Sequence, residues 1–285
     1  MTSLVEVVVI ATIAGCATGL GALPTLVTDR VSHRVYDGAL GLAGGIMVGA
    51  AVFALVLPGL ELGTPLEVVA GVLLGGAFLL VTNAVLPHLH LWFRDDRLEG
   101  TTVLEPVGGN SGSDPSPTTV RRGETDDTDG RADSEDDLRR AALVGSAVTI
   151  HNVPEGLAVG IAFASGETAL GLAIATAIAV QNVPDGFAIA VPAARAGLSR
   201  SKTLLYTTLS GGVPEPIAAA AGFALVAVVT GLFPIAAGFA AGAMIAVVFR
   251  ELVPSSHGHG YADTATATFV LGFAIMLIVD TTLAV

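Results

Sequence analysis

Long apolar stretches separated by short polar connections make up most of this chain. Each stretch is close to, or longer than, the ~20 residues with which an α-helix crosses a bilayer. The spacing therefore predicts eight membrane-spanning helices. Between the sixth and seventh stretches only "TGLFP", Thr230–Pro234, provides a turn, so one long kinked helix is the alternative there. The predicted helices are Leu4–Val27, Gly38–Leu60, Val68–Leu91, Ala141–Ser165, Ala169–Ala194, Thr203–Thr230, Leu232–Phe249 and Thr264–Val285.

The composition is that of a membrane protein. Of the 285 residues, 52% are hydrophobic and 13% are charged, and the mean hydropathy is +0.74. The first stretch has no basic residue before it and carries Glu6, so we expect a retained helix rather than a cleaved secretory signal. The segment "IAGC", Ile13–Cys16, is similar to a lipoprotein cleavage box, but that alternative lacks the preceding positive charge. Cys16 is the single cysteine, which excludes an intrachain disulfide and a thiolate metal cluster.

The basic residues predict the orientation of the helices. All 13 Lys and Arg residues lie in, or at the ends of, alternate connections, and basic connections face the cytoplasm under the positive-inside rule. Both termini are therefore expected outside, which also requires an even number of helices. Residues 92–140 are rich in Gly, Ser, Pro and Asp and are expected to form a disordered acidic cytoplasmic loop, which holds 13 of the 25 acidic residues of the chain. Residues 1–91 and 141–285 are expected to form one membrane domain.

Two similar polar motifs interrupt the apolar pattern. The first, "TIHNVPEGLAVGIA", spans Thr149–Ala162, and the second, "VQNVPDGFAIAVP", spans Val180–Pro192. On a helix, residues three and four positions apart are neighbours. His151 and Asn152 are therefore expected beside Glu155, on one wedge of the fourth helix.

The second motif repeats this wedge on the fifth helix with Gln181, Asn182 and Asp185. Pro154 and Pro184 each lack a backbone N–H, so each leaves a carbonyl without its helical donor at the level of the wedge. Interrupted helices inside a membrane are tolerated where protein, water or an ion satisfies the backbone, and they mark ion or substrate sites in transporters. The repeated motif therefore predicts a polar site in the middle of the membrane.

A third carboxylate, Glu215, lies between two prolines in "GGVPEPIAAA" on the sixth helix. Three buried carboxylates cannot all remain ionised unless a cation or protons neutralise them. One imidazole with carboxylate and amide oxygens suits Zn²⁺, Fe²⁺, Mn²⁺ or Cd²⁺ better than Ca²⁺ or Cu⁺. The alternative is that these groups only hydrogen-bond to one another and hold helices together. So many acids in one layer favour the metal site.

The motifs "HNVPEG", "QNVPDG" and "PEP", with a variable loop between the third and fourth helices, resemble the ZIP (Zrt-, Irt-like protein) family of metal transporters, and its bacterial and archaeal branch in particular. The resemblance covers essentially the whole chain. It implies an all-α integral membrane fold of eight helices in a 3+2+3 arrangement. An inverted pseudo-twofold repeat would relate the first three helices to the last three, and divalent metal would be taken up toward the cytoplasm.

The resemblance also implies a ligand set, with two departures from the family pattern. Asp185 is one methylene shorter than the usual glutamate, and Asn182 is neutral where binuclear members can have an aspartate, which puts a fully occupied second metal position in doubt. Met47 aligns with a methionine near the centre, although a lone methionine also serves packing. The residues similar to primary ligands are His151, Glu155, Asp185 and Glu215, and those similar to ligands of the second position are Asn152, Gln181 and Asn182.

On the seventh helix, "FRELVPSSHGHG" resembles a family segment that begins with a His-Glu or Ser-rich pair, but Arg250 stands where a histidine can stand and Ser255 replaces an acid. His257 and His259 are expected near the cytoplasmic helix ends, where they would be metal-release ligands if they cluster. The other histidines expected near these ends are His33, His88 and His90.

The sequence thus indicates a membrane transporter that takes up zinc, or iron, manganese or cadmium, into the cytoplasm across the cytoplasmic membrane. No G-x-x-x-x-G-K-[ST] sequence is present for ATP use. A metal sensor that binds without flux is one alternative. An intramembrane metalloenzyme is another, but the chain lacks H-E-x-x-H and an obvious nucleophile, so an enzyme is not expected. We expect no resident cofactor and no nucleic-acid partner, and a homodimer is compatible with the sequence.

Overall fold

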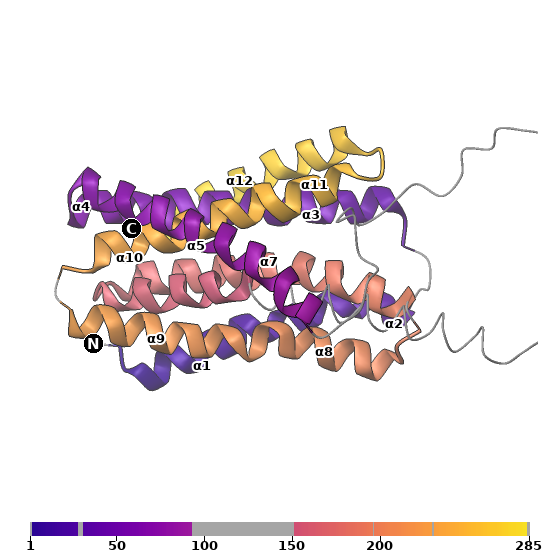
Figure 1. Cartoon of the computed structure of the whole chain (residues 1–285), viewed down its shortest axis with the longest axis horizontal. Coiled ribbons are helices and arrows are strands. Elements are labelled where there is room, and N and C mark those ends of the chain that lie inside the picture. Colours follow the sequence, from indigo (N-terminus) through magenta and orange to yellow (C-terminus); the bar gives the residue numbers. More distant parts are fainter. Residues whose placement is uncertain (1, 28–30, 93–150, 196, 230, 284–285) are drawn as a thin grey trace, which may run out of the picture.

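In the computed structural model, the described part of the chain is residues 2–27, 31–92, 151–195, 197–229 and 231–283. It is helical throughout, with short turns and no strand among these residues. Residues 151–164 form a helix. The other α-helices carry the labels of Figure 1, and the short 3₁₀ and π-helical segments are labelled η1 to η3. These are α1 (Leu4–Cys16), η1 (Ala17–Ala22), α2 (Leu23–Val27), α3 (His33–Gly49), η2 (Ala50–Val56), α4 (Leu57–Leu62), α5 (Pro65–Trp92), α7 (Thr168–Arg195), α8 (Arg200–Gly212), α9 (Pro214–Val228), α10 (Phe233–Val247), η3 (Val248–Leu252), α11 (Val253–His257) and α12 (Ala262–Leu283).

Seven helical segments of the described chain are long and apolar enough to cross a membrane. They correspond to seven of the eight predicted helices. The helix at residues 151–164 belongs to the remaining one, whose first part lies outside the described residues, as does nearly all of the predicted loop 92–140. The seven segments are Leu4–Val27, His33–Leu62, Pro65–Thr82, Thr168–Ala194, Arg200–Val228, Phe233–His257 and Ala262–Thr282.

The turn expected between the sixth and seventh helices is present. Helix α9 ends at Val228 and α10 begins at Phe233, with Gly231 between them at a φ of +86°. Because this left-handed conformation favours glycine, the chain reverses there instead of continuing as one kinked helix.

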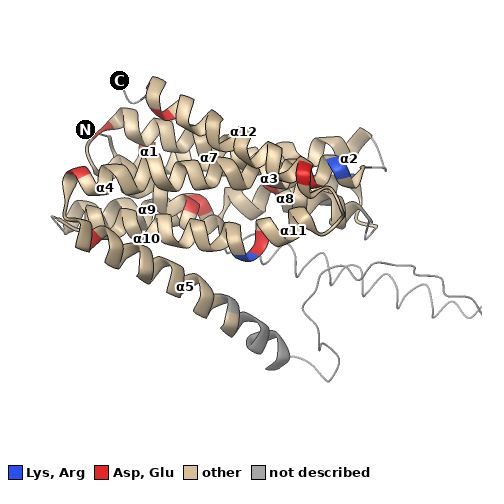
Figure 2. Ribbon diagram, turned by 90° about the horizontal axis from the view of Figure 1, so that it is seen from above, with Lys and Arg blue, Asp and Glu red and all other residues tan. Residues whose placement is uncertain are grey.

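The helices form an elongated bundle in which α7 is central. Helices α1, α8 and α9 lie on one side of α7 and α3 and α12 on the other (Figure 1). The start of α1 and the end of α12 lie at the same end of the bundle in both views (Figures 1 and 2). Such a placement requires an even number of crossings between them. Figure 2 shows acidic positions at mid-length of the bundle as well as at its ends.

Glycines let particular pairs of helices approach closely. A side chain at Gly45 on α3 would overlap the backbone of Phe269 on α12, and one at Gly75 on α5 would overlap the backbone of Phe239 on α10. Gly160 is equally close to the backbone of Ala219 on α9. Small residues bring helices together in lipid, where no hydrophobic force pairs them. Glycines therefore allow the close packing of these pairs of helices.

Two adjacent glycines of α5 provide a matched test of this packing. We expect Gly75→Ala to destabilise the protein by about 1–3 kcal/mol, because its methyl group must displace backbone of α10. At Gly76 the nearest facing atom would be the carbonyl oxygen of Gly242 at 3.8 Å, so Gly76→Ala is expected to be neutral, or stabilising by up to ~1 kcal/mol from helix propensity. Thermal unfolding of the purified variants measures both; equal unfolding midpoints would contradict the role of Gly75.

Two spanning helices contain a π-helical turn with a proline at the second position after it. In "VFALVLP", Val52–Pro58, the π turn is η2, and in "VFRELVP", Val248–Pro254, it is η3. The two segments share the Val-Phe pair and the proline at the same spacing. A π turn inserts one residue into the helical ladder and is frequent at functional sites. Only η3 has charged residues in this turn, Arg250 and Glu251.

Candidate metal site

Polar side chains from three helices are buried at mid-length of the bundle. The helix at residues 151–164 contributes the first motif, α7 contributes the second, and the first turn of α9 contributes the third carboxylate. None of these side chains is more than 4% exposed. All seven polar ligands predicted from the sequence belong to this set, which is His151, Asn152, Glu155, Gln181, Asn182, Asp185 and Glu215.

The asparagine side chains compensate for interrupted helices. Asn152 donates from Nδ2 to the carbonyl oxygen of Ser210 at 2.8 Å. That carbonyl has no helical donor four residues on, because Pro214 lacks an N–H. Asn182 donates from Nδ2 to the carbonyl oxygen of Ala14, also at 2.8 Å, where α1 changes into the tighter helix η1. Each amide nitrogen is therefore directed at backbone.

Two of the three carboxylates each accept one hydrogen bond from an amide. Gln181 donates from Nε2 to Oε1 of Glu155 at 2.8 Å, and Asn182 donates from Nδ2 to Oε1 of Glu215 at 2.8 Å. Asp185 is 2% exposed, and neither of its oxygens has a hydrogen-bond partner among the described residues. The α7 helix thus links the other two helices through its amides.

Each of the seven side chains also has at least one buried nitrogen or oxygen atom without a hydrogen-bond partner among the described residues. Leaving such an atom unpaired in a low-dielectric interior costs several kcal/mol for a neutral group and more for a carboxylate. Side chains that served only to hold helices together would pair these atoms with one another. The unpaired atoms are His151 Nε2, Asn152 Oδ1, Glu155 Oε2, Gln181 Oε1, Asn182 Oδ1, Asp185 Oδ1 and Oδ2, and Glu215 Oε2.

The chemistry of these atoms is that of a cation site. Six of the side chains offer oxygen lone pairs and one offers an imidazole nitrogen, the donor types that Zn²⁺ and related divalent ions accept. Within the described residues, no three His, Cys, Asp or Glu side chains are grouped closely enough to hold a metal ion. The side-chain contacts within the site join one carboxylate to one amide or imidazole group. The side chains must therefore move before several of them can bind one ion.

Glu251 is a contact of this site that the sequence analysis did not assign. His151 Nδ1 and Glu251 Oε2 are 3.1 Å apart. Because a carboxylate only accepts, Nδ1 carries the hydrogen and Nε2 presents its lone pair when the imidazole is neutral. Carboxylates commonly orient metal-binding histidines in this way. The π turn η3 positions Glu251 for this contact.

Removing the Glu251 carboxylate is expected to weaken zinc binding about 10- to 100-fold, because His151 would lose the group that fixes its ring and tautomer. We expect this loss for Glu251→Gln in zinc titrations of the purified protein, with partial recovery in Glu251→Asp. Glu61, at the end of α4 and exposed, gives the control variant Glu61→Gln. Unchanged affinity in Glu251→Gln would remove Glu251 from the site.

Met47 is buried on α3 within the apolar core. Its burial fits packing as well as a ligand, so its role as a ligand stays a prediction.

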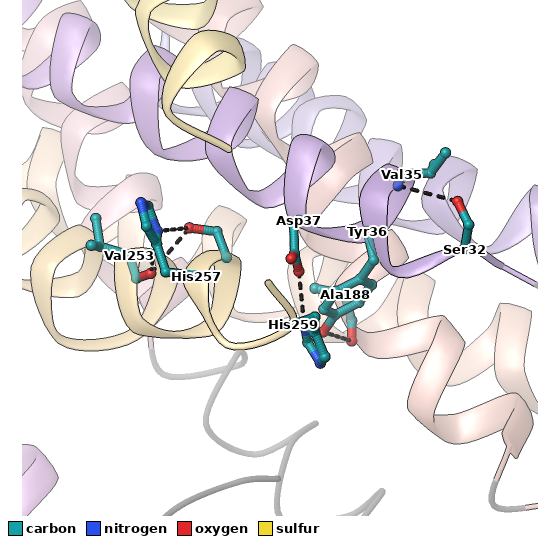
Figure 3. Close-up of polar contacts among 9 residues, drawn as sticks. Ser32, Val35, Tyr36, Asp37, Ala188, Val253, His257 and His259 are labelled. Carbon is teal, nitrogen blue, oxygen red and sulfur yellow. Dashed lines mark hydrogen bonds and ion pairs between the residues drawn. The ribbon is translucent and has the colours of Figure 1, made fainter. Parts of the chain in front are cut away.

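His257 and His259 have different partners in this structure (Figure 3). His257 bonds the carbonyl oxygen of Val253 at 2.9 Å within its own helix. His259 Nδ1 instead lies 2.7 Å from Oδ1 of Asp37 on α3, and its ring stacks on His33 with centroids 4.5 Å apart. The rings of His257 and His259 do not contact a common partner, and their role in metal release stays a prediction.

Asp37 was also missed by the sequence analysis. It is fully buried, and its second oxygen, Oδ2, has no partner among the described residues. Beside it, Tyr36 donates its hydroxyl to the carbonyl oxygen of Ala188 on α7 at 3.5 Å (Figure 3). The sequence signal for this contact was the presence of an acidic residue four positions after His33. Such a pair is common near helix ends and does not by itself indicate a site.

The sequence profile of the family described as ZIP Zinc transporter matches residues 5–280. The chain belongs to the ZIP family. The family member "Zinc transporter GufA" of Myxococcus xanthus is 36% identical over 280 residues, covering 95% of this chain and 96% of that protein. "Zinc transporter ZIPB" of Bordetella bronchiseptica is 34% identical, with coverage of 94% and 78%, and human "Zinc transporter ZIP11" is 33% identical, with coverage of 92% and 93%.

These matches confirm the family predicted from the motifs, in its bacterial branch. As a ZIP protein, the chain is a metal transporter and not an enzyme, as predicted.

Proposed function

We propose that this ZIP protein takes up zinc through the buried polar site described above. The observation that carries the proposal is the set of unpaired lone-pair atoms, one or more on each of seven side chains inside a membrane bundle. A divalent cation passing through would supply the partner that each atom lacks. The names of the three relatives support zinc as the ion.

In this proposal the zinc ion is cargo, held transiently. His151, Glu155, Asp185 and Glu215 would be its main ligands, with the amide oxygens of the two motifs lying alongside. Because Gln181 and Asn182 hold one oxygen each of Glu155 and Glu215, the ion would first meet the free oxygens and Asp185. The same donor set accepts Fe²⁺, Mn²⁺ and Cd²⁺, so we propose zinc as the preferred ion rather than the exclusive one.

We further propose eight helices in the cytoplasmic membrane, with both termini outside and residues 92–140 in the cytoplasm. The placement of both chain ends at one end of the bundle and the basic residues of alternate connections support this topology. The matching π turns before Pro58 and Pro254 support an inverted repeat that relates the first three helices to the last three.

Flux into liposomes tests the proposal. Purified protein reconstituted into vesicles with a zinc-sensitive dye inside should admit external zinc, and vesicles without protein should not. A metal sensor would bind zinc without flux, and that result would refute transport through this site. Parallel measurements with Fe²⁺, Mn²⁺ and Cd²⁺ rank the ions.

The acidic loop is expected to be dispensable for this flux. Deleting residues 108–130, which lie outside the described part of the chain, should leave the initial zinc flux within a fewfold of the full-length rate, because their composition is that of a solvated linker. The flux assay above measures this. Complete loss in a correctly inserted deletion variant would show that the loop delivers metal or gates the path.

A further inference from the structure

A long apolar groove lies on the bundle between the first helical segment, α3 and α7. Its volume is about 820 Å³. The walls come from α1, η1 and α2 on one side and from α3 and α7 on the others, and Thr176 is the one lining residue with a polar side chain. Alanines such as Ala39 and Ala179 create the hollow, since their side chains leave space that larger residues would fill. We call it the lateral groove.

The lateral groove runs along the direction in which the helices cross the membrane. Its lining residues on α7 recur at helical spacing from Leu172 to Phe187, and at 1.5 Å per residue this stripe is about 22 Å long. One leaflet of the hydrocarbon core is about 15 Å thick, half of the ~30 Å bilayer core. The groove is therefore long enough for an extended lipid chain that reaches across one leaflet.

The groove is narrow. Dividing 820 Å³ by the length of the stripe gives a mean cross-section of about 40 Å². A single extended chain of methylene groups fits within such a cross-section.

An exposed cation directly precedes a residue that lines one end of the groove. Pro24 of α2 and Val35 of α3 line this end, and Arg34 directly precedes Val35. Arg34 is exposed in the first turn of α3 and has no ion pair with any residue that the structure describes. A guanidinium at a helix end near the membrane surface matches the phosphate of a lipid headgroup.

From the apolar lining, the length, the narrow cross-section and Arg34, we infer that the lateral groove binds one phospholipid, with an acyl chain in the groove and an anionic headgroup at Arg34. The walls also carry parts of the metal site. Ala14, whose carbonyl accepts from Asn182, lines the groove, and so do Val183 and Pro184, which separate Asn182 from Asp185 in sequence. The bound chain therefore packs against the back of the segment that holds these two side chains.

The test measures lipid binding directly. Delipidated protein is titrated with phosphatidylglycerol, and bound lipid is counted by native mass spectrometry. We expect one tight site in the wild type and at least tenfold weaker binding in Ala39→Phe, whose ring fills the groove. Ala224, exposed on α9 and outside the groove, gives the matched control Ala224→Phe, which should bind like the wild type.

The headgroup is tested separately. Arg34→Gln should reduce the preference for phosphatidylglycerol over neutral phosphatidylcholine severalfold, while Lys202→Gln, at the start of α8, should leave it unchanged. An equal preference in Arg34→Gln and wild type would overturn the headgroup assignment.

The groove assignment fails if wild-type protein has no tight site, or if Ala39→Phe binds lipid as the wild type does. It also fails if Ala39→Phe changes only the oligomeric state, because the groove would then be an interface between copies. If Ala39→Phe does not elute as folded protein in size-exclusion chromatography, two other variants test the groove. These are Ala39→Val, with a smaller side chain, and Ala17→Phe on the opposite wall, and both are expected to bind lipid more weakly than the wild type.

Discussion

Glu155→Ala is expected to lower the initial zinc flux at least about 100-fold, and His151→Ala is expected to do the same. Even residues that only orient a metal ligand change affinity about 10- to 100-fold, so loss of a ligand itself should cost at least as much. Within the described part of the chain, Oε2 of Glu155 and Nε2 of His151 have no hydrogen-bond partner, and Glu251 orients the His151 ring. Flux into dye-loaded liposomes measures the loss.

Two control variants separate the site from the fold. Glu167 is exposed at the start of α7, so Glu167→Ala should transport like the wild type. Glu155→Gln retains the shape and one oxygen of the side chain but not its charge, and it should be nearly as inactive as Glu155→Ala with an unchanged unfolding temperature. Wild-type flux in either Glu155 variant or in His151→Ala would show that the ion does not pass through this site.

The second large effect is expected with pH. Three buried carboxylates cannot remain ionised together without a cation, so protons take the place of zinc in the empty site. Zinc binding must displace those protons, and His151 must be neutral to ligate. Apparent zinc affinity should therefore fall as the pH falls, by up to about tenfold per pH unit for each proton displaced.

Calorimetry in buffers of different ionisation enthalpy counts these protons. Asp185→Asn removes the carboxylate that has no hydrogen-bond partner among the described residues, and it should reduce the number of protons released per zinc bound. Asp263 in the first turn of α12 provides the control, Asp263→Asn, with unchanged release. The converged-carboxylate site would be wrong if zinc binding released no protons near neutral pH, or if Asp185→Asn and wild type released the same number.

The positions of the helices were predictable from the sequence because one physical quantity, the hydropathy of each segment, determines which segments cross the membrane. A span of hydrocarbon needs an uninterrupted apolar helix, so hydropathy alone located segments such as Leu4–Val27 and His33–Leu62 to within a few residues. The candidate ligands were visible in the sequence for the same reason. A histidine or carboxylate in an apolar stretch, such as Glu215, is costly and therefore conspicuous.

The partners of these side chains were not predictable in the same way. Glu251 contacts His151, which lies 100 positions away in the sequence. The extra residue of a π turn sets the direction of the Glu251 side chain. Neither the register of that turn nor the facing helix follows from local spacing. Asn152 and Asn182 read as ligands, but their bonds to the carbonyls of Ser210 and Ala14 depend on where other helices break.

The bonds of Asn182 restrict how this site can evolve. Its one amide nitrogen serves both the carbonyl oxygen of Ala14 and Oε1 of Glu215. The family resemblance implies an aspartate at this position in binuclear members. That change would place an acceptor opposite the Ala14 carbonyl and opposite Glu215, and it would leave the Ala14 carbonyl with only the backbone N–H of Ala17 as a donor. A compensating substitution, near the junction of α1 and η1 or at Glu215, would have to precede or accompany the change of Asn182 to aspartate. A single nucleotide change converts an asparagine codon to an aspartate codon, yet here the protein must cross a deleterious intermediate to gain a second acidic ligand at this position.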